Sequence, residues 1–169
     1  SIKKDWQGLR LLATAGPTSE DIDLARVLTN RSSGKMGIYL AQAAKLRGAE
    51  VDLICGQVQI SEDLFQGLRT FEIKSALEMQ KKLFELQPHA DAISMAAAIS
   101  DFKFPKSITE KKGKLQKQDL IKCIGGKLEL TPDLLAELVS RKPPYQAILG
   151  FSALAGEDAY IIETGKKKQ

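Results

Sequence analysis

The sequence is poor in the residues that form disulfide frameworks and metal sites. Its 169 residues include two cysteines, Cys55 and Cys123, and a single histidine, His89. The cysteines form no C-x-x-C pair and make no disulfide framework. Without a cluster of histidine and cysteine a zinc site is disfavoured, and we assign no metal ligand. We expect the chain to work in a reducing compartment, the cytoplasm.

Long apolar runs are also missing. No stretch reaches the roughly 20 apolar residues that a membrane-spanning helix needs. Residues 1–6 have no apolar stretch behind their positive charges, so no secretory signal is expected. The composition, 43% hydrophobic and 27% charged, is typical of a soluble globular domain. No internal repeat is visible, and we interpret residues 1–169 as a single domain.

Two glycine motifs that bind phosphate groups are absent. The pattern G-x-G-x-x-G does not follow the first predicted strand, and the second strand ends in Cys55-Gly56 without an acid to hold a ribose hydroxyl. These absences disfavour an NAD(P)-dependent oxidoreductase, which stays open as an alternative function. The pattern G-x-x-x-x-G-K-[ST] does not occur either, so the chain is not a P-loop enzyme.

Short apolar runs alternate with helical patterns along the chain. We predict strands at residues 9–14, 51–55, 70–73, 92–97 and 147–151. We predict helices at residues 35–47, between Ser75 and Pro88, and from Thr131-Pro132-Asp133 to about Lys142. Because the strands are continuous apolar runs, they indicate a parallel sheet covered on both faces. The expected fold is α/β, Rossmann-like and doubly wound, with a mainly parallel sheet and helices on both faces.

Each predicted helix carries a specific signal. In the first, we expect one apolar face, made of Met36, Leu40, Ala43 and Ala44. The second begins with the capping box Ser75-x-x-Glu78 and has one apolar face, made of Ala76, Met79, Leu83 and Leu86. In the third, Thr131 is expected to cap the helix, with Pro132 at the first helical position.

The connection after the first predicted strand is long and polar. It has nearly twenty residues, 16–33, where such connections usually take about 2–6. In open α/β sheets, ligands bind beyond the carboxyl ends of the strands. The connection enters the helix through Asn30-Arg31-Ser32-Ser33-Gly34-Lys35, whose hydroxyls and backbone N–H groups suit an anion. The equally open alternative is that Ser32 or Ser33 only caps the helix, and that Gly34 and Gly37 permit close packing.

A basic stretch covers residues 103–127, in a segment without a clear period. It contains eight lysines, opposed only by Glu110 and Asp119. It could form a flexible flap that closes over phosphate groups. Two alternatives stay open. One is a solvated loop, and the other is a basic nucleic-acid-binding module, although Phe104 is the only aromatic residue available there for base stacking.

Seven short segments follow one another in a distinctive order. They are residues 11–18, 23–26, 30–37, 96–102, 114–117, 131–135 and 150–151. The most specific reads Asn30-Arg31-Ser32-Ser33-Gly34-Lys35-Met36-Gly37. Together they resemble the phosphopantothenate–cysteine ligase (phosphopantothenoylcysteine synthetase) family, and more closely the synthetase half of the bacterial bifunctional flavoprotein of coenzyme A biosynthesis. The order and spacing hold from about Asp5 to Phe151.

The resemblance implies a reaction. In that family a nucleoside triphosphate, usually CTP in bacteria, activates the carboxylate of 4′-phosphopantothenate as an acyl-nucleotide, and pyrophosphate leaves. The amine of cysteine then displaces the nucleotide monophosphate to give 4′-phosphopantothenoylcysteine. The resemblance therefore implies CTP with Mg²⁺, and FMN only where a decarboxylase domain is fused. It also implies a homodimer formed through the synthetase domain, with no nucleic-acid or membrane partner.

The resemblance also implies site residues. Asn30 would contact the activated acyl group, Arg26 would hold the substrate or intermediate, and Lys114 would act from the mobile flap at 103–127. The nucleotide would contact Met95, Ala96, Ala97, Asp101, Lys114, Thr131, Pro132, Asp133, Leu134, Phe151 and Lys166. The phosphate groups and the acid substrate would contact Gly16, Ser32, Ser33, Gly34, Lys35 and Lys117.

The chain departs from the family pattern in three places. Thr131 stands where the family usually has asparagine. After Gly150-Phe151 the chain reads Ser152-Ala153-Leu154-Ala155, where the family usually reads Ala-Ala-Glu-Thr. The chain is also expected to lack the C-terminal segment of the family domain, because it stops at Gln169.

Overall fold

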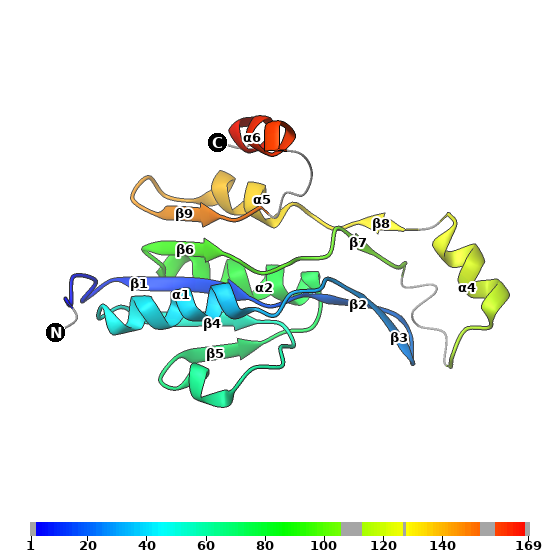
Figure 1. Ribbon diagram of the computed structural model, residues 1–169, viewed down its shortest axis with the longest axis horizontal. Coiled ribbons are helices and arrows are strands. Elements are labelled where there is room, and N and C mark those ends of the chain that lie inside the picture. Colours follow the sequence, from blue (N-terminus) through cyan, green and yellow to red (C-terminus); the bar gives the residue numbers. More distant parts are fainter. Residues whose placement is uncertain (1–2, 106–112, 127, 153–157, 168–169) are drawn as a thin grey trace.

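A five-stranded parallel sheet forms the centre of the chain (Figure 1). The computed structural model describes residues 3–105, 113–126, 128–152 and 158–167. The strands of the sheet are β1 (Arg10–Ala15), β4 (Glu50–Cys55), β5 (Arg69–Glu72), β6 (Ala92–Met95) and β9 (Ala147–Gly150). Their order is β5-β4-β1-β6-β9. All five predicted strands are present, and the carboxyl ends of neighbouring strands lie side by side, with Thr14 paired to Met95 and Ala15 to Cys55.

Helices cover both faces of this sheet, as predicted. One face lies under α1 (Lys35–Leu46), and its buried cluster includes Leu11, Ala13 and Leu53. The other face lies under α2 (Ala76–Leu86) and α5 (Leu134–Arg141), and its buried cluster includes Leu12, Ile54 and Ile93. Figure 1 shows α1 in front of the sheet and α2 behind it. Because successive residues of β1 point to opposite faces, a doubly covered strand must be apolar throughout.

The buried face of α1 differs from the predicted one. The helix buries Gly37, Ile38, Ala41 and Ala44. Of the predicted face only Ala44 is buried, and Met36 is 51% exposed. Gly37 explains this orientation, because a Cβ built on it would lie 2.5 Å from the Thr14 carbonyl oxygen. Small residues let α1 approach β1 this closely, so the larger side chain of Met36 is turned away from the sheet.

The other two predicted helices begin with side-chain caps. In α2 the Ser75 hydroxyl accepts a hydrogen bond from the Glu78 N–H at 3.2 Å, which confirms the capping start, and the predicted apolar face is buried. In α5 the cap is Asp133, not Thr131 as predicted. The Thr131 hydroxyl does not cap the helix because it donates to the Ser100 carbonyl instead. The cap position of α5 is therefore one place beyond the proline.

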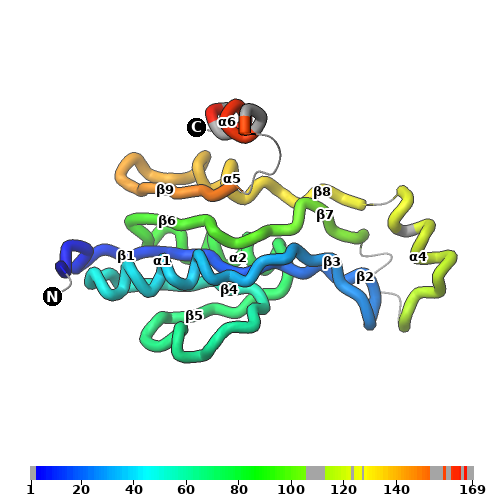
Figure 2. Tube along the Cα trace, viewed as in Figure 1, coloured from blue at the N-terminus to red at the C-terminus, as the bar shows by residue number. Residues whose placement is uncertain are grey.

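The long connection after β1 is not a loop. It forms an antiparallel pair of strands, β2 (Ser19–Asp23) and β3 (Arg26–Thr29). A second short antiparallel pair, β7 (Phe102–Lys103) and β8 (Glu129–Leu130), lies beside it. Figure 2 shows both pairs extending beyond the sheet towards α4 (Lys117–Ile124), away from β9 and α5. The sequence pattern missed β2 because its Glu20 and Asp23 are buried charged residues.

Two buried amide side chains hold β9 beside β6. The Gln146 Nε2 donates to the carbonyls of Gln87 and Ala90, at 2.8 and 2.6 Å, and its Oε1 accepts from the Gln87 Nε2 at 3.2 Å. The remaining described elements are the 3₁₀ turns η1 (Glu62–Phe65) and η2 (Gln87–His89), and the helix α6 (Asp158–Lys167). No helix within the described ranges is long and apolar enough to cross a membrane.

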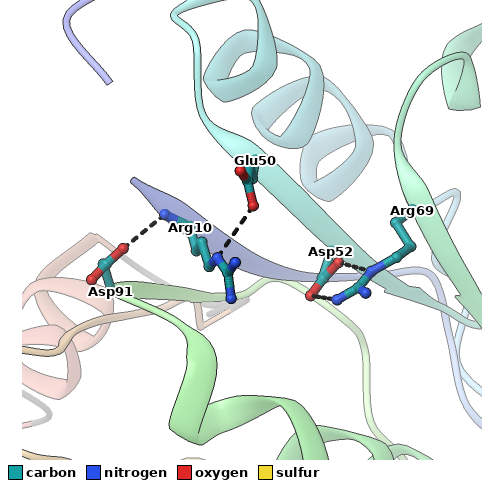
Figure 3. A network of polar contacts seen from close by, with 5 residues as sticks. All are labelled: Arg10, Glu50, Asp52, Arg69 and Asp91. Atoms are coloured by element: carbon teal, nitrogen blue, oxygen red, sulfur yellow. Dashed lines mark hydrogen bonds and ion pairs between the residues drawn. The ribbon is translucent and has the colours of Figure 1, made fainter. Parts of the chain in front are cut away.

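A set of exposed charges lines the amino ends of the strands, opposite the carboxyl edge (Figure 3). The Arg10 N–H donates to the Asp91 carboxylate at 2.8 Å, and the Arg10 guanidinium pairs with Glu50 at 3.2 Å. Next to them, Arg69 donates to both carboxylate oxygens of Asp52. Exposed ion pairs of this kind contribute little to stability. Their contribution is to the alignment of β1, β4 and β5.

Replacing Gly37 with alanine tests the close contact between α1 and β1. The new Cβ meets a backbone carbonyl rather than a flexible side chain, so α1 must move outward. After the gain in helix propensity, we expect a net loss of about 1–2 kcal/mol in the free energy of unfolding. Chemical denaturation followed by circular dichroism measures it. The control is Gly126→Ala, because nothing lies within 4 Å of that Cβ position. Equal stability of the two variants would contradict the contact.

Candidate functional site

The pairing of β1 with β6 continues past the carboxyl ends of the two strands. The Thr14 hydroxyl accepts hydrogen bonds from the N–H groups of Ala96 and Ala97, both at 3.1 Å. Further on, the Ala98 N–H donates to the Gly16 carbonyl at 2.9 Å. These bonds fix the backbone that leaves β6 at the edge where ligands bind in open α/β sheets.

Two side chains that flank the β2–β3 pair hold the same backbone from another side. The buried Thr18 hydroxyl accepts a hydrogen bond from the Ser100 N–H at 2.8 Å. The Asn30 Nδ2 donates to the carbonyls of Ala98 and Ile99, at 3.3 and 3.0 Å. No donor from the described part of the chain reaches the Asn30 Oδ1. This oxygen is therefore available to accept a hydrogen bond from a ligand.

A cavity of about 790 Å³, cavity A, lies between the segment after β6, the end of β9 and α5. It brings together eight of the residues predicted to contact a nucleotide. They are Met95, Ala97, Asp101, Thr131, Pro132, Asp133, Leu134 and Phe151. Its described lining contains no lysine or arginine. Cavity A has the shape of a ligand site without the charge that a triphosphate would need.

Hydrogen bonds join the two sides of cavity A. The Thr131 N–H donates to the Asp101 carbonyl at 2.9 Å, and the Phe151 N–H donates to the Met95 carbonyl at 3.3 Å. The Asp101 side chain is exposed, and its carboxylate makes no hydrogen bond or ion pair with the residues that the structure describes. A carboxylate in this position could accept hydrogen bonds from the base or the sugar of a nucleotide.

A second cavity, cavity B, has a volume of about 900 Å³ and includes Asn30 in its lining. Nearly half of its lining residues belong to the segment 55–62, at and after the end of β4. Burial, with a smaller contribution from the Glu72 carboxylate, raises the pKa of the Cys55 thiol to about 11. The thiol therefore stays protonated at neutral pH and is a poor nucleophile. Cavity B is also lined by Glu62 and, in its described part, by no lysine or arginine.

The start of α1 lies against the end of β1. Gly34 occupies the cap position with a φ of 72°, in the left-handed region that favours glycine, and no acidic residue stands in the first turn. A Cβ on Gly34 would lie 3.0 Å from the Gly16 nitrogen, so close packing here is real. The Ser33 hydroxyl accepts a long hydrogen bond, 3.4 Å, from the Lys35 N–H. The predicted phosphate-contact residues Gly16, Ser32, Ser33, Gly34 and Lys35 line neither cavity.

Arg26 and the described lysines Lys114 and Lys117 are not brought to either cavity. The Arg26 Nη2 donates to the Leu115 carbonyl at 3.4 Å, and the Leu115 N–H donates to the Asp23 carboxylate at 3.0 Å. Lys114 and Lys117 flank this contact and line neither cavity. Four lysines of the predicted flap lie outside the described residues, namely Lys106, Lys111, Lys112 and Lys127.

The charge of Asp23 is set by its partners. Burial by itself raises the pKa of Asp23, but the N–H groups of Ala25 and Leu115 and the charge of Arg26 outweigh it. Its pKa therefore lies below the ordinary value, and the group is a carboxylate at neutral pH. The Arg26 guanidinium lies 3.5 Å from one of its oxygens.

Sequence reasoning gave no site role to three polar residues that shape the site, Thr14, Thr18 and Asp23, although they lie in the segments 11–18 and 23–26 that carry the resemblance. The sequence feature that could have identified them is a polar side chain that lies inside, or directly after, an apolar or extended run. Three residues that were predicted to contact a nucleotide, Ala96, Lys114 and Lys166, do not line cavity A. Ala96 uses its N–H on Thr14, and Lys166 lies on α6.

The described residues offer no cage for a metal ion. Within the described ranges no group of three or more His, Cys, Asp or Glu residues could hold one. Cavity A contains two carboxylates, and that of Asp133 is engaged as the cap of α5. A magnesium ion here would therefore take most of its oxygen ligands from a bound triphosphate and water.

Sequence comparisons place the chain in one family. Residues 6–169 match the family model of the DNA/pantothenate metabolism flavoprotein C-terminal domain. The chain is 38% identical over 151 residues to the coenzyme A biosynthesis bifunctional protein CoaBC of Bacillus subtilis, a match that covers 87% of the chain and 34% of that protein. It is 36% identical over 167 residues to a cysteine/cysteine sulfinic acid decarboxylase of an unknown prokaryotic organism, covering 99% of the chain and 45% of that protein. The chain thus spans less than half the length of these relatives.

A solved structure shares both fold and sequence with the chain. The crystal structure of the C-terminal domain of the coenzyme A biosynthesis bifunctional protein CoaBC matches with a TM-score of 0.76 at 33% identity. The match covers 96% of this chain and 71% of that one. The chain therefore belongs to the DNA/pantothenate metabolism flavoprotein C-terminal domain family, and it is similar to the C-terminal domain of the bifunctional coenzyme A biosynthesis protein CoaBC.

Proposed function

We propose that the chain makes 4′-phosphopantothenoylcysteine from 4′-phosphopantothenate and cysteine, with CTP as the activating nucleotide. The observation that carries this proposal is the composition of cavity A. Eight residues assigned to nucleotide binding come from three separate segments, 95–101, 131–134 and 151, and line one cavity at the carboxyl edge of the sheet. Family membership supports the ligase over the oxidoreductase and nucleic-acid alternatives, which are not proposed.

The reaction needs two steps because a carboxylate is a poor electrophile. In the first, a carboxylate oxygen of 4′-phosphopantothenate attacks the α-phosphorus of CTP, and pyrophosphate leaves. In the second, the cysteine amine attacks the acyl carbon, and CMP leaves with the electron pair of the broken carbon–oxygen bond. Charge moves onto phosphate in both steps, so the protein acts mainly by positioning and electrostatics.

In this proposal each task of the reaction has a residue suited to it. Cavity A holds the nucleotide, and Asp101 accepts hydrogen bonds from its base or ribose. Asn30 holds the backbone beside the cavity with its Nδ2 and contacts the activated acyl group. Arg26 holds the acid substrate or the intermediate. Lys35, at the positive end of α1, contacts a phosphate group.

The charges of the triphosphate must be balanced from outside cavity A, because its described lining has no cation. We propose residues 103–127 as a basic flap that supplies Lys114 and Lys117, in a chain that works as a homodimer. Mg²⁺ would accompany the triphosphate and add positive charge at its oxygens, with no protein ligand assigned. FMN is proposed only for a decarboxylase domain fused to this one.

The purified chain tests the activity directly. With CTP, Mg²⁺, 4′-phosphopantothenate and cysteine, we expect one pyrophosphate for each phosphopantothenoylcysteine formed. A coupled pyrophosphate assay and mass spectrometry of the product measure both. In parallel reactions, ATP is expected to give a kcat/KM at least about tenfold lower than CTP. A folded chain that releases no pyrophosphate with either nucleotide would contradict the proposal.

Substitution of Asn30 by aspartate tests the acyl site. Aspartate keeps the size but has no N–H, so the carbonyls of Ala98 and Ile99 lose two hydrogen bonds and face a negative charge. We expect kcat/KM to fall by roughly 10²-fold, because the displaced backbone no longer positions the reacting groups. Steady-state pyrophosphate release measures the change. The neighbouring substitution Arg31→Lys keeps the local charge and serves as the control. Unchanged turnover in Asn30→Asp would reject the assignment of Asn30.

A further inference from the structure

Two charged side chains at the β2–β3 turn form hydrogen bonds with the backbone of Leu115, which is distant in sequence. The Asp23 Oδ2 accepts a hydrogen bond from the Leu115 N–H at 3.0 Å, and the Arg26 Nη2 donates to the Leu115 carbonyl at 3.4 Å. The Leu115 side chain is itself buried. Both backbone polar groups of Leu115 are therefore held by a single turn.

The two oxygens of the Asp23 carboxylate have separate tasks. The Oδ1 accepts a hydrogen bond from the Ala25 N–H at 2.8 Å, within the turn itself. The Oδ2 reaches Leu115, and the Arg26 guanidinium lies 3.5 Å from the same oxygen. The side chain of Asp23 is only 1% exposed, so water does not compete for these contacts. The contact through Oδ2 serves residues 113–117 rather than the turn.

The segment 113–117, which Asp23 and Arg26 hold through Leu115, carries positive charges that the described linings of the cavities lack. Lys114 precedes Leu115 directly, and neither cavity has a lysine or arginine in its described lining. The Arg26 Nη1 is buried and lies 3.5 Å from the Asp23 Oδ2, but it makes no hydrogen bond with the described residues. Such a donor would gain a hydrogen bond from an anion. Lys114 is thus the sequence neighbour of the residue whose carbonyl Arg26 contacts.

We propose that Asp23 is a positioning residue. It joins Leu115 and Arg26 so that Lys114 and Arg26 meet the anionic substrates as one ordered cationic group. This inference rests on the proposed function, because it takes those anions to be the nucleotide and the phosphorylated acid. Asp23 does not touch a substrate, and it acts through the Leu115 backbone and the Arg26 guanidinium.

Hydrogen exchange tests the contact itself. In Asp23→Ala the Leu115 N–H loses its acceptor, and in Asp23→Asn one side-chain oxygen remains for two N–H groups. We expect the Leu115 amide to exchange at least about tenfold faster in Asp23→Ala, with Asp23→Asn in between. Asp21→Asn is the matched control, because Asp21 lies on the same strand and pairs with Lys74 instead. Exchange at the wild-type rate in Asp23→Ala would overturn the inference.

Kinetics separate positioning from a general loss of structure. We expect Asp23→Ala to lower kcat/KM for CTP by about tenfold, with Asp23→Asn recovering part of the loss. The KM for cysteine, which carries no phosphate, should stay the same. In a Lys114→Gln background, Asp23→Ala should cost less than about twofold, because both changes act through one segment. Fully additive losses, or an equal rise in the KM for cysteine, would overturn the inference.

Failure of the proposed function would give a different pattern. A wild-type chain that binds CTP but releases no pyrophosphate would contradict the ligase activity alone. In that case, calorimetry of CTP binding still tests the role of Asp23. We expect Asp23→Ala to raise the CTP dissociation constant about tenfold. An unchanged dissociation constant in that variant, or no binding of CTP to the wild-type chain, would overturn the positioning role.

Discussion

The hydrogen bonds that extend the β1–β6 pairing beyond the sheet are the constraint on which the site depends. The Thr14 hydroxyl and the Gly16 carbonyl hold the backbone that leaves β6. The following residues are held again, because Thr18 and Asn30 bind them from the side of the β2–β3 pair. One wall of cavity A is thus backbone of fixed position. A wall of this kind can hold a flat ring closely, since no long side chain must be ordered when the ligand binds.

In this arrangement, the residues that shape the cavities are not the residues that carry positive charge. Ala96, Ala97 and Ala98 make their contacts through backbone groups, so their small side chains leave room rather than fill it. The described linings of both cavities also contain no lysine or arginine. Anions are gathered by positive charge, which in a water-poor site is worth more than at an open surface. The sheet edge can therefore supply position, whereas the cations proposed for the site, Lys35 and Lys114 among them, lie outside both cavities.

The layers of the fold were predictable from the sequence, but the contacts between them were not. Five apolar runs are the five strands of the sheet, because doubly covered strands must be apolar on both faces. The predicted face of α1 was wrong, since periodicity favours large apolar residues and Gly37 packs because it is small. The β2–β3 pair was missed because Glu20 and Asp23 bury their charges only with partners far away in sequence. No periodicity could bring the segments that line cavity A together, and the resemblance supplied those residues.

The two buried carboxylates of β2 show how a short pair of strands can connect the two halves of such a site. Glu20 accepts a hydrogen bond from the Ala76 N–H at 2.7 Å, at the start of α2, and burial raises its pKa. Asp23 makes the corresponding contact with Leu115, but its pKa lies below the ordinary value. A lowered pKa means that this contact stabilises the fold at neutral pH and is lost only as the pH falls through that lowered value. The contact therefore persists wherever the lysines and Arg26 are charged and a triphosphate is fully ionised. The β2–β3 pair can then transmit the fixed geometry of the sheet to the residues that supply the charge.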